Sequence, residues 1–225
     1  MSRLVAKAIV GLACVSLAMA ALLFGLPQTL DYWQAWMFLA VYLAPSVAMV
    51  VWLAVRDPAL LERRIRGGPL AEKEPRQKVI MWITSAGFVA LLAVAGLDRR
   101  NEWSHMPALV AAFGDLLVGL GWWLSYRVFR ENAFASATIE QVPGQEVIST
   151  GPYALVRHPM YAGGMAMFFG IPIALGSWWA AVVVLALLPA LAWRMLDEER
   201  FLKRSLPGYA AYMERVRYRL IPHVW

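Results

Sequence analysis

The chain has 225 residues, of which 60% are hydrophobic and 16% are charged, and its formal net charge is +6. This apolar fraction exceeds that of an ordinary soluble domain and indicates an integral membrane protein. A single cysteine, Cys14, excludes an intrachain disulfide framework and a cysteine-based metal site. Because the basic residues flank apolar stretches, we expect them to face anionic lipid headgroups rather than nucleic acid.

Six apolar stretches, each about long enough to cross a hydrocarbon core of about 30 Å, follow one another along the chain. They cover residues 4–26, 33–55, 79–97, 107–128, 159–175 and 177–194. We therefore expect an all-α integral membrane protein with about six transmembrane helices. We expect the last two stretches to form a tight hairpin around Gly176, and one long helix broken near Pro172 is the alternative. Ala18-Met19-Ala20 resembles a signal-peptide cleavage site, but the apolar run continues to Leu26, so we predict a retained helix.

The distribution of Lys and Arg predicts the orientation in the membrane. If the N-terminus is cytosolic, the inner segments hold 19 of the 21 Lys and Arg residues, and the outer loops hold only Arg99 and Arg100. Both termini and the long segments 56–78 and 127–158 then face the cytosol. We interpret the basic residues of 56–78 as a topology signal on a solvated loop, and contact with anionic lipid or substrate is the alternative.

One polar cluster stands where a predicted cytosolic loop becomes a membrane helix. Proline suits the first position of a helix, so the stretch from 159 should begin at Pro159, with Arg157 and His158 at its mouth and Tyr161 one turn inside. Free N–H groups and the helix dipole favour an anion there, and an arginine can bind a carboxylate or phosphate with two hydrogen bonds. An interfacial cluster that binds lipid headgroups explains the same residues equally well.

A second polar cluster, Asp197-Glu198-Glu199-Arg200, follows the last apolar stretch. Acidic residues are disfavoured at a helix C-terminus, so we expect the helix to continue beyond the membrane and the carboxylates to have partners, with Arg194 pairing with Glu198. Small residues recur at every fourth position of the preceding stretch, at Ala162, Ala166 and Gly170. This spacing predicts close packing against the stretch 177–194, which would bring Arg157 beside the second cluster.

Other polar residues leave more than one interpretation open. Tyr209 and Tyr212 lie on one face of a predicted amphipathic surface helix, which either covers a site or rests on lipid. Asp115 lies inside a predicted span, and we interpret it as structural or protonated, with a substrate role as the alternative. The three histidines are too scattered to predict a metal site.

Taken together in this order, the motifs resemble those of the isoprenylcysteine carboxyl methyltransferase family and of its relatives, the membrane phospholipid methyltransferases. The resemblance covers about residues 130–225, and the first half of the chain matches only as generic membrane helices. The residues that carry it are Gly151, Tyr153, Arg157-His158-Pro159-Met160-Tyr161-Ala162-Gly163, Glu198-Glu199, Tyr209, Tyr212, Arg215-Val216 and Pro222. It implies one membrane domain in which residues 1–128 provide four helices and 129–225 provide the cofactor-binding loop, hairpin and tail.

The resemblance also implies an S-adenosylmethionine-dependent methyltransferase whose cofactor binds at the cytosolic membrane face. The implied cofactor-binding residues are Gln141, Gly151, Tyr153, His158, Pro159, Tyr161, Gly163, Glu198 and Glu199. Arg157 or Arg215 would position the acceptor, and Glu199 would balance charge, so these three are the catalytic candidates. Arg194, Tyr209 and Tyr212 are the candidate substrate-binding residues.

The acceptor stays open at this stage. Carboxyl methylation of an isoprenylcysteine-like lipid is the leading hypothesis, with a lipophilic acceptor that reaches the site from the bilayer. Phospholipid amines and thiols are the alternatives, and an amine would require a base such as His158 or a glutamate. Two further hypotheses are an NADPH-dependent sterol-type reductase that uses Arg215, Arg217 and Arg219, and a transporter or scaffold without enzymatic activity.

Overall fold

The structure, a computed structural model, describes residues 2–72, 74–139 and 142–225 and is all-helical over these ranges. In chain order the helices are α1 (Ser2–Ala20), α2 (Trp33–Arg56), α3 (Pro58–Ile65), α4 (Pro75–Asn101), α5 (Ala108–Glu131), α6 (Pro159–Ala174), α7 (Trp178–Ser205) and α8 (Tyr209–Arg215). A π-helical segment, η1 (Ala21–Gly25), extends α1, and a short 3-10 turn, η2 (Gly151–Ala154), precedes α6.

Five helical segments are long and apolar enough to cross a membrane: Arg3–Gly25, Trp33–Arg56, Pro75–Asn101, Ala108–Glu131 and Trp178–Ser205. The sixth predicted span corresponds to α6, an apolar helix of only 16 residues. The prediction of an all-α integral membrane protein is confirmed. The predicted hairpin is also present, because α6 ends at Ala174 and Gly176 turns the chain with a φ of +73°.

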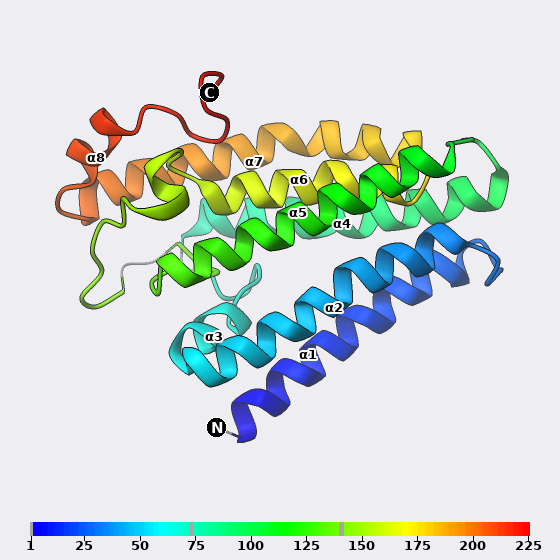
Figure 1. Cartoon of the computed structure of the whole chain (residues 1–225), viewed down its shortest axis with the longest axis horizontal. Helices are drawn as coiled ribbons and strands as arrows, with labels where there is room; N and C mark the ends of the chain where they lie inside the picture. The colour runs from blue at the N-terminus through cyan, green and yellow to red at the C-terminus, as the bar shows by residue number, and fades with distance from the viewer. Residues whose placement is uncertain (1, 73, 140–141) are drawn as a thin grey trace.

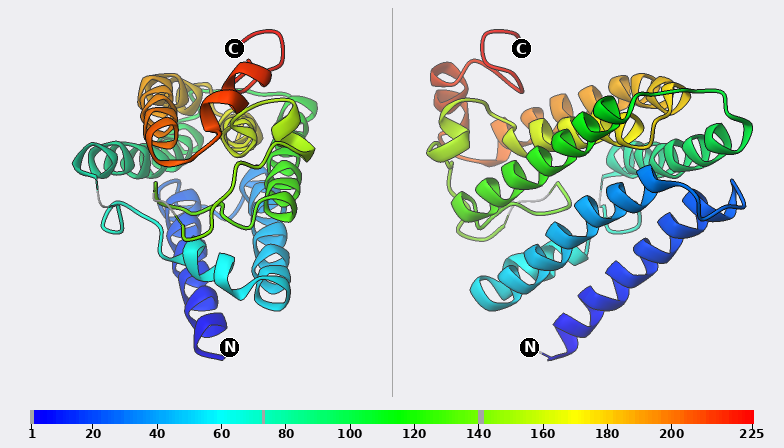
Figure 2. Two further views of the ribbon diagram at one scale, coloured as in Figure 1. Left: turned by 90° about the vertical axis from the view of Figure 1, so that its left-hand side faces the viewer. Right: turned by 45° about the vertical axis from the view of Figure 1, so that its right-hand side comes forward.

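The helices form two groups (Figure 1). Helices α4 to α7 lie alongside one another, and the α1–α2 hairpin meets this group near the connection between α1 and α2 and diverges from it toward the N-terminus (Figures 1 and 2). The contact at the meeting point is close, because a Cβ on Gly96 of α4 would lie 2.6 Å from the Leu22 carbonyl oxygen of η1. The divergence leaves α1 and α4 apart at the end where α3 and α8 lie.

The small-residue stripe of α6 packs differently from the prediction. A Cβ on Gly170 would lie 2.7 Å from the Gly114 carbonyl oxygen, and one on Gly121 would lie 2.5 Å from the Gly163 carbonyl oxygen. Gly114 and Gly121 belong to α5, whereas Gly163 and Gly170 belong to α6, so these glycines join α6 to α5. The predicted contact of Gly170 with α7 is therefore wrong. Close backbone approach needs small residues on both helices, and α5 has them at matching positions.

The segment 56–78 is also more ordered than the predicted solvated loop. Pro58 occupies the first turn of α3, and the Asp57 carboxylate accepts the Leu60 N–H at 2.8 Å, which caps the helix. Leu60 and Leu61 are buried in the core between α1, α2 and α5. Further along, Glu72 and Gln77 are almost completely buried. The segment is therefore part of the folded structure and not only a topology signal.

Candidate functional site

A cavity of about 680 Å³ lies at the end of the molecule that carries α3 and α8. One part, which we call the polar chamber, is lined by Arg64, Tyr153, His158, Tyr161, Glu198 and Tyr209. The other part, the apolar branch, extends between α1, α4 and α6 and is lined by Val15, Met19, Phe88, Leu92 and Phe168. The volume falls in the range of about 300–1,000 Å³ that is typical of small-molecule and cofactor sites.

The start of α6 forms one wall of the polar chamber. Pro159 is the first helical residue, as predicted, and His158 is the N-cap. The backbone N–H groups of Arg157 and His158 donate to the carbonyl oxygens of Tyr218 and Arg219, each at 2.9 Å. These two N–H groups are therefore occupied by the C-terminal tail. An anion at this helix start would have to use the N–H groups of the first helical turn instead.

Glu199 is the centre of a buried cluster that fastens the tail to α6 and α7. Its Oε1 accepts a hydrogen bond from Arg157 Nε at 2.7 Å and lies 3.2 Å from His158 Nε2, and its Oε2 accepts one from Arg219 Nε at 3.0 Å. Arg157 also donates from NH1 to the carbonyl oxygens of Val216 and Arg217. We call the side chains of Glu199, Arg157, His158 and Arg219 the Glu199 cluster. Arg157 and His158 line the cavity, whereas Glu199 is not among the lining residues.

Glu198, the neighbouring carboxylate, faces the cavity. Its Oε2 accepts a hydrogen bond from the Tyr161 hydroxyl at 2.6 Å. Tyr153, Tyr209 and Tyr212 complete this aromatic wall, and the Tyr212 hydroxyl donates to the Tyr153 carbonyl oxygen at 2.8 Å. Burial raises the pKa of Tyr153 to about 12 and the pKa of Tyr209 and Tyr212 above the usual range, so all three phenols are protonated at neutral pH.

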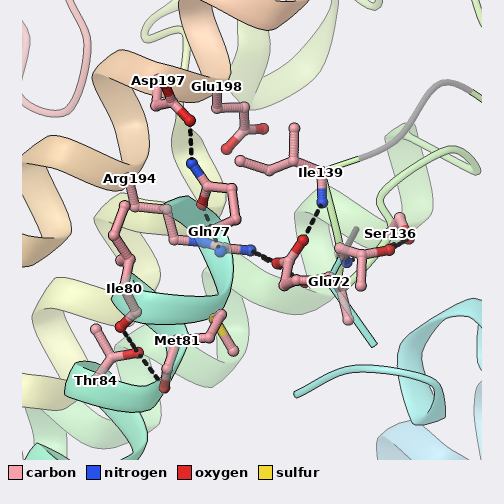
Figure 3. Close-up of polar contacts among 12 residues, drawn as sticks. Glu72, Gln77, Ile80, Met81, Thr84, Ser136, Ile139, Arg194, Asp197 and Glu198 are labelled. Atoms are coloured by element: carbon pink, nitrogen blue, oxygen red, sulfur yellow. Dashed lines mark hydrogen bonds and ion pairs between the residues drawn. The ribbon is translucent and has the colours of Figure 1, made fainter. Parts of the chain in front are cut away.

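A second cluster is built around Arg194 of α7, one turn before Glu198 (Figure 3). Arg194 donates to Glu72 Oε1 at 2.8 Å and to Gln77 Oε1 at 2.9 Å, and Gln77 donates in turn to Asp197. We call these four side chains the Arg194 cluster. The predicted pair of Arg194 with Glu198 is not formed, because Arg194 turns toward Glu72 and Glu198 binds Tyr161. The prediction that the carboxylates of 197–199 have partners holds for all three.

The remaining predicted site residues lie away from the cavity or outside the described ranges. Gly151 has a φ of +55°, and a Cβ there would lie 2.9 Å from the Glu131 carboxylate, so it forms a turn. Gly163 packs on α5, and Arg215 is exposed at the end of α8 and does not line the cavity. Gln141 lies outside the residues that the structure describes.

Arg64 lines the cavity but was not among the predicted site residues. It projects from α3 into the polar chamber and donates from NH1 to the Ser136 carbonyl oxygen at 3.1 Å. The capping pair Asp57-Pro58 is a sequence signal for the start of α3. Counting from this start would have placed Arg64 in the last turn of a helix. Glu72 and Gln77 had no comparable signal, because their partners lie more than 100 residues away.

Two comparisons with known proteins find similar sequences. The model of a family described as phospholipid methyltransferase matches residues 109–207, from α5 to the end of α7. Delta(14)-sterol reductase TM7SF2 of the mouse (Mus musculus) is 32% identical over 105 residues, which are 43% of this chain and 25% of that protein. The chain therefore spans about a quarter of the length of this curated relative. The matched segment 109–207 contains the start of α6, Glu198 and the α7 residues of both buried clusters, so the likeness to phospholipid methyltransferases covers the part of the candidate site that α6 and α7 form.

Proposed function

We propose that this protein is an S-adenosylmethionine-dependent methyltransferase that acts at the membrane surface on a lipophilic acceptor. The observation that carries the proposal is a single cavity in which a polar chamber opens into an apolar branch between membrane helices. A polar cofactor and a lipid chain need these two environments side by side. The likeness of residues 109–207 to phospholipid methyltransferases supports the same reading.

The residues of the polar chamber fit the cofactor. Glu198 offers a carboxylate to a sulfonium or an ammonium group, and the Tyr161 hydroxyl orients that carboxylate. Tyr153 and Tyr209 offer aromatic surface, and the first turn of α6 offers N–H groups to a carboxylate. When bound, S-adenosylmethionine supplies a methyl group: the acceptor's lone pair forms the bond to the methyl carbon while the carbon–sulfur bond breaks and its electron pair stays on sulfur.

The protein's contribution is therefore alignment and the exclusion of water, which together supply several kcal/mol of barrier reduction. The C-terminal tail is hydrogen-bonded to Arg157 and His158, two residues that line the cavity. In this proposal Arg157 and Glu199 are positioning residues, because Arg157 is held by Glu199 and by two tail carbonyl groups. Arg215 is exposed, and we no longer assign it a role at the acceptor.

For the acceptor we keep two candidates. A carboxylate on an isoprenylcysteine-like lipid needs no base, and the resemblance of the motifs favours it. A phospholipid amine must lose a proton, which Glu198 or His158 is placed to accept, and the family match favours this acceptor. Transfer of a labelled methyl group to an S-prenylated cysteine analogue or to phosphatidylethanolamine, tested in parallel, separates them. We also propose the orientation predicted from Lys and Arg, with both termini and the chamber cytosolic.

The test of the cofactor is direct binding of S-adenosylmethionine to the purified protein by calorimetry. We expect wild-type binding, at least tenfold weaker binding by Glu198→Gln because a charged partner is lost, and unchanged binding by Glu214→Gln, an exposed acid on α8. Tyr161→Phe removes the hydroxyl that orients Glu198 and should weaken binding roughly fivefold. If the wild-type protein does not bind S-adenosylmethionine, the methyltransferase proposal is wrong.

A second candidate is a double-bond reductase, because the mouse relative is a sterol reductase. Its nicotinamide cofactor would need cations for a phosphate group. The arginines first considered for this role do not line the cavity: Arg215 and Arg217 are exposed, and Arg219 binds Glu199. Oxidation of NADPH in the presence of a sterol with a ring double bond, together with a failure to bind S-adenosylmethionine, would favour this candidate over the first.

A further inference from the structure

Arg64 differs from the other cavity arginines in its partners. The guanidinium of Arg157 is paired with Glu199, and that of Arg194 is paired with Glu72. Within residues 2–72, 74–139 and 142–225, no carboxylate forms an ion pair with Arg64. Its NH1 donates to the Ser136 carbonyl oxygen at 3.1 Å and to Met160 Sδ at 3.6 Å, and its guanidinium lies 5.0 Å from the ring centroid of Phe129.

The position of Arg64 is fixed by the structure around it. Its neighbour Arg63 donates to the Ala133 carbonyl oxygen, and a Cβ on Gly67 would lie 2.7 Å from the Ala137 side chain. The C-terminal end of α3 is thus packed along residues 133–137. A long side chain that is held in this way loses little further entropy when it binds a ligand.

The charge of Arg64 is retained in spite of burial. Desolvation lowers the pKa of its guanidinium to about 10, and the like charge of Arg194 also lowers it, while Tyr161 and Tyr153 raise it. At neutral pH the group therefore stays cationic in a partly desolvated site. A partly buried cation without an ionic partner costs free energy that a ligand anion recovers.

The two sides of the polar chamber therefore carry opposite charge. Glu198, which accepts a hydrogen bond from Tyr161, offers a carboxylate on the α7 side, while Arg64 offers a guanidinium without an ionic partner on the α3 side. α3 packs against α1, whose residues Val15 and Met19 line the apolar branch. A molecule whose chain lies in the branch would bring its headgroup toward Arg64.

We propose that Arg64 is the anion receptor of this cavity and binds the phosphate or carboxylate group of an anionic amphiphile whose chain occupies the apolar branch. This inference deepens the proposed function and rests on it, because the amphiphile would be the methyl acceptor. Both acceptor candidates carry such a group, a phosphodiester in a phospholipid and a carboxylate in a prenylated cysteine. The planar guanidinium fork suits either anion.

The experiment uses three probes with one chain and different headgroups: dodecyl phosphate, dodecanoate and dodecanol. Binding to the full-length protein in uncharged micelles is measured by native mass spectrometry. We expect the wild type to bind at least one of the anionic probes roughly tenfold more tightly than dodecanol. Preference for the phosphate or for the carboxylate identifies the kind of headgroup.

The variants are Arg64→Gln and the matched control Arg63→Gln. Both remove one positive charge from α3 and one contact with residues 133–136, but only Arg64 lines the cavity. Arg64→Gln should lose the tenfold preference for the anion and leave dodecanol binding unchanged, whereas Arg63→Gln should keep the preference. If Arg64→Gln does not fold, Arg64→Lys decides: we expect several-fold weaker anion binding because the fork is lost.

Three outcomes would overturn the inference: a wild type without preference for an anion, an equal loss in both glutamine variants, or Arg64→Lys that binds the three probes as the wild type does. S-adenosylmethionine binding is measured on the same samples. If the wild type binds no S-adenosylmethionine, the methyltransferase proposal fails, whatever the probes show. If Arg64→Gln weakens S-adenosylmethionine binding but not probe binding, Arg64 serves the cofactor and this inference alone fails.

Discussion

The polar chamber has two walls that bury charge in opposite ways. In the Glu199 cluster one carboxylate receives three basic side chains, and all four residues come from the second half of the chain. In the Arg194 cluster one guanidinium from α7 is received by Glu72 and Gln77, which precede it by more than 100 residues. The first cluster fastens the tail to α6 and α7, and the second fastens the α3–α4 connection to α7.

The comparison indicates that the stability lost when one member of a buried cluster is replaced depends on the charges that are left without a partner. Without Glu199, three basic groups would be left facing one another, whereas without Arg194 only Glu72 would be left uncompensated. A buried charge that loses its partner costs more than the pair itself contributes. The four predictions below test this difference, from the largest expected effect to the smallest.

Glu199→Gln should have the largest effect. It keeps the shape of the side chain but removes the charge that balances Arg157 and Arg219, so we expect a loss of about 3–5 kcal/mol of unfolding free energy. Because the tail depends on this cluster, limited proteolysis should release the segment after Val216 before the helices are cut. Glu214→Gln on the exposed face of α8 is the control. Wild-type stability and tail protection in Glu199→Gln would show that the cluster contributes nothing.

Arg194→Met should destabilise the protein by about 2–3 kcal/mol, because it leaves the Glu72 carboxylate buried without its cation. Adding Glu72→Gln to the same chain removes the leftover charge and should restore more than half of the loss. A double-mutant cycle measured by denaturant unfolding in detergent gives the coupling free energy. If the effects of the two single substitutions on the unfolding free energy add without a coupling term, the pairing drawn in Figure 3 is contradicted.

Gly121→Ala should disturb the Glu199 cluster and leave the Arg194 cluster intact. A Cβ at this position would meet the Gly163 carbonyl oxygen at 2.5 Å and push the start of α6 away from α5, at a cost of about 1–3 kcal/mol. The tail should then become sensitive to protease, because Arg157 and His158 move with α6. The Arg194 cluster, which lacks α6 residues, should keep its coupling free energy. Gly119→Ala, where a Cβ meets nothing within 4 Å, should behave as the wild type.

Asp115→Asn should have the smallest effect. Asp115 lies in α5 and is 7% exposed, and neither carboxyl oxygen has a hydrogen-bond partner among the described residues. Replacement of an unpaired buried acid by a neutral isostere should change the unfolding free energy by less than about 1 kcal/mol, in the stabilising direction. A loss above about 2 kcal/mol in thermal unfolding would mean that Asp115, unlike the members of the two clusters, has a partner that matters only in the membrane.

Much of the fold was predictable because its signals are local. The apolar stretches predicted the membrane helices, Pro159 predicted the start of α6, and Gly176 predicted the turn before α7. The acidic run at 197–199 correctly indicated a helix that continues past the apolar stretch, since α7 extends to Ser205. Each of these features depends on residues within one or two helical turns, where propensity and periodicity act.

The errors concern contacts between distant segments. The small residues of α6 were expected to meet α7, but any helix with matching glycines satisfies the same spacing, and α5 has them. Arg194 was expected to pair with Glu198, one turn away, but an ion pair within one helix contributes little, and Glu72 offers Arg194 a buried partner. The basic residues of 56–78 were interpreted by their number, which conceals that Arg64 enters the cavity while Arg63 does not.

The sequence by itself determined the membrane character, the helices and the placement of Arg157, His158, Glu198 and Glu199 at helix ends, because these follow from hydrophobicity and backbone stereochemistry along the chain. Only the tertiary structure decided that Glu199 lies behind the cavity while Glu198 faces it, and that Arg64 completes the polar chamber from α3. The physical reason is that a charge finds its partner by burial and distance in space, and helix packing sets both of these independently of separation along the chain.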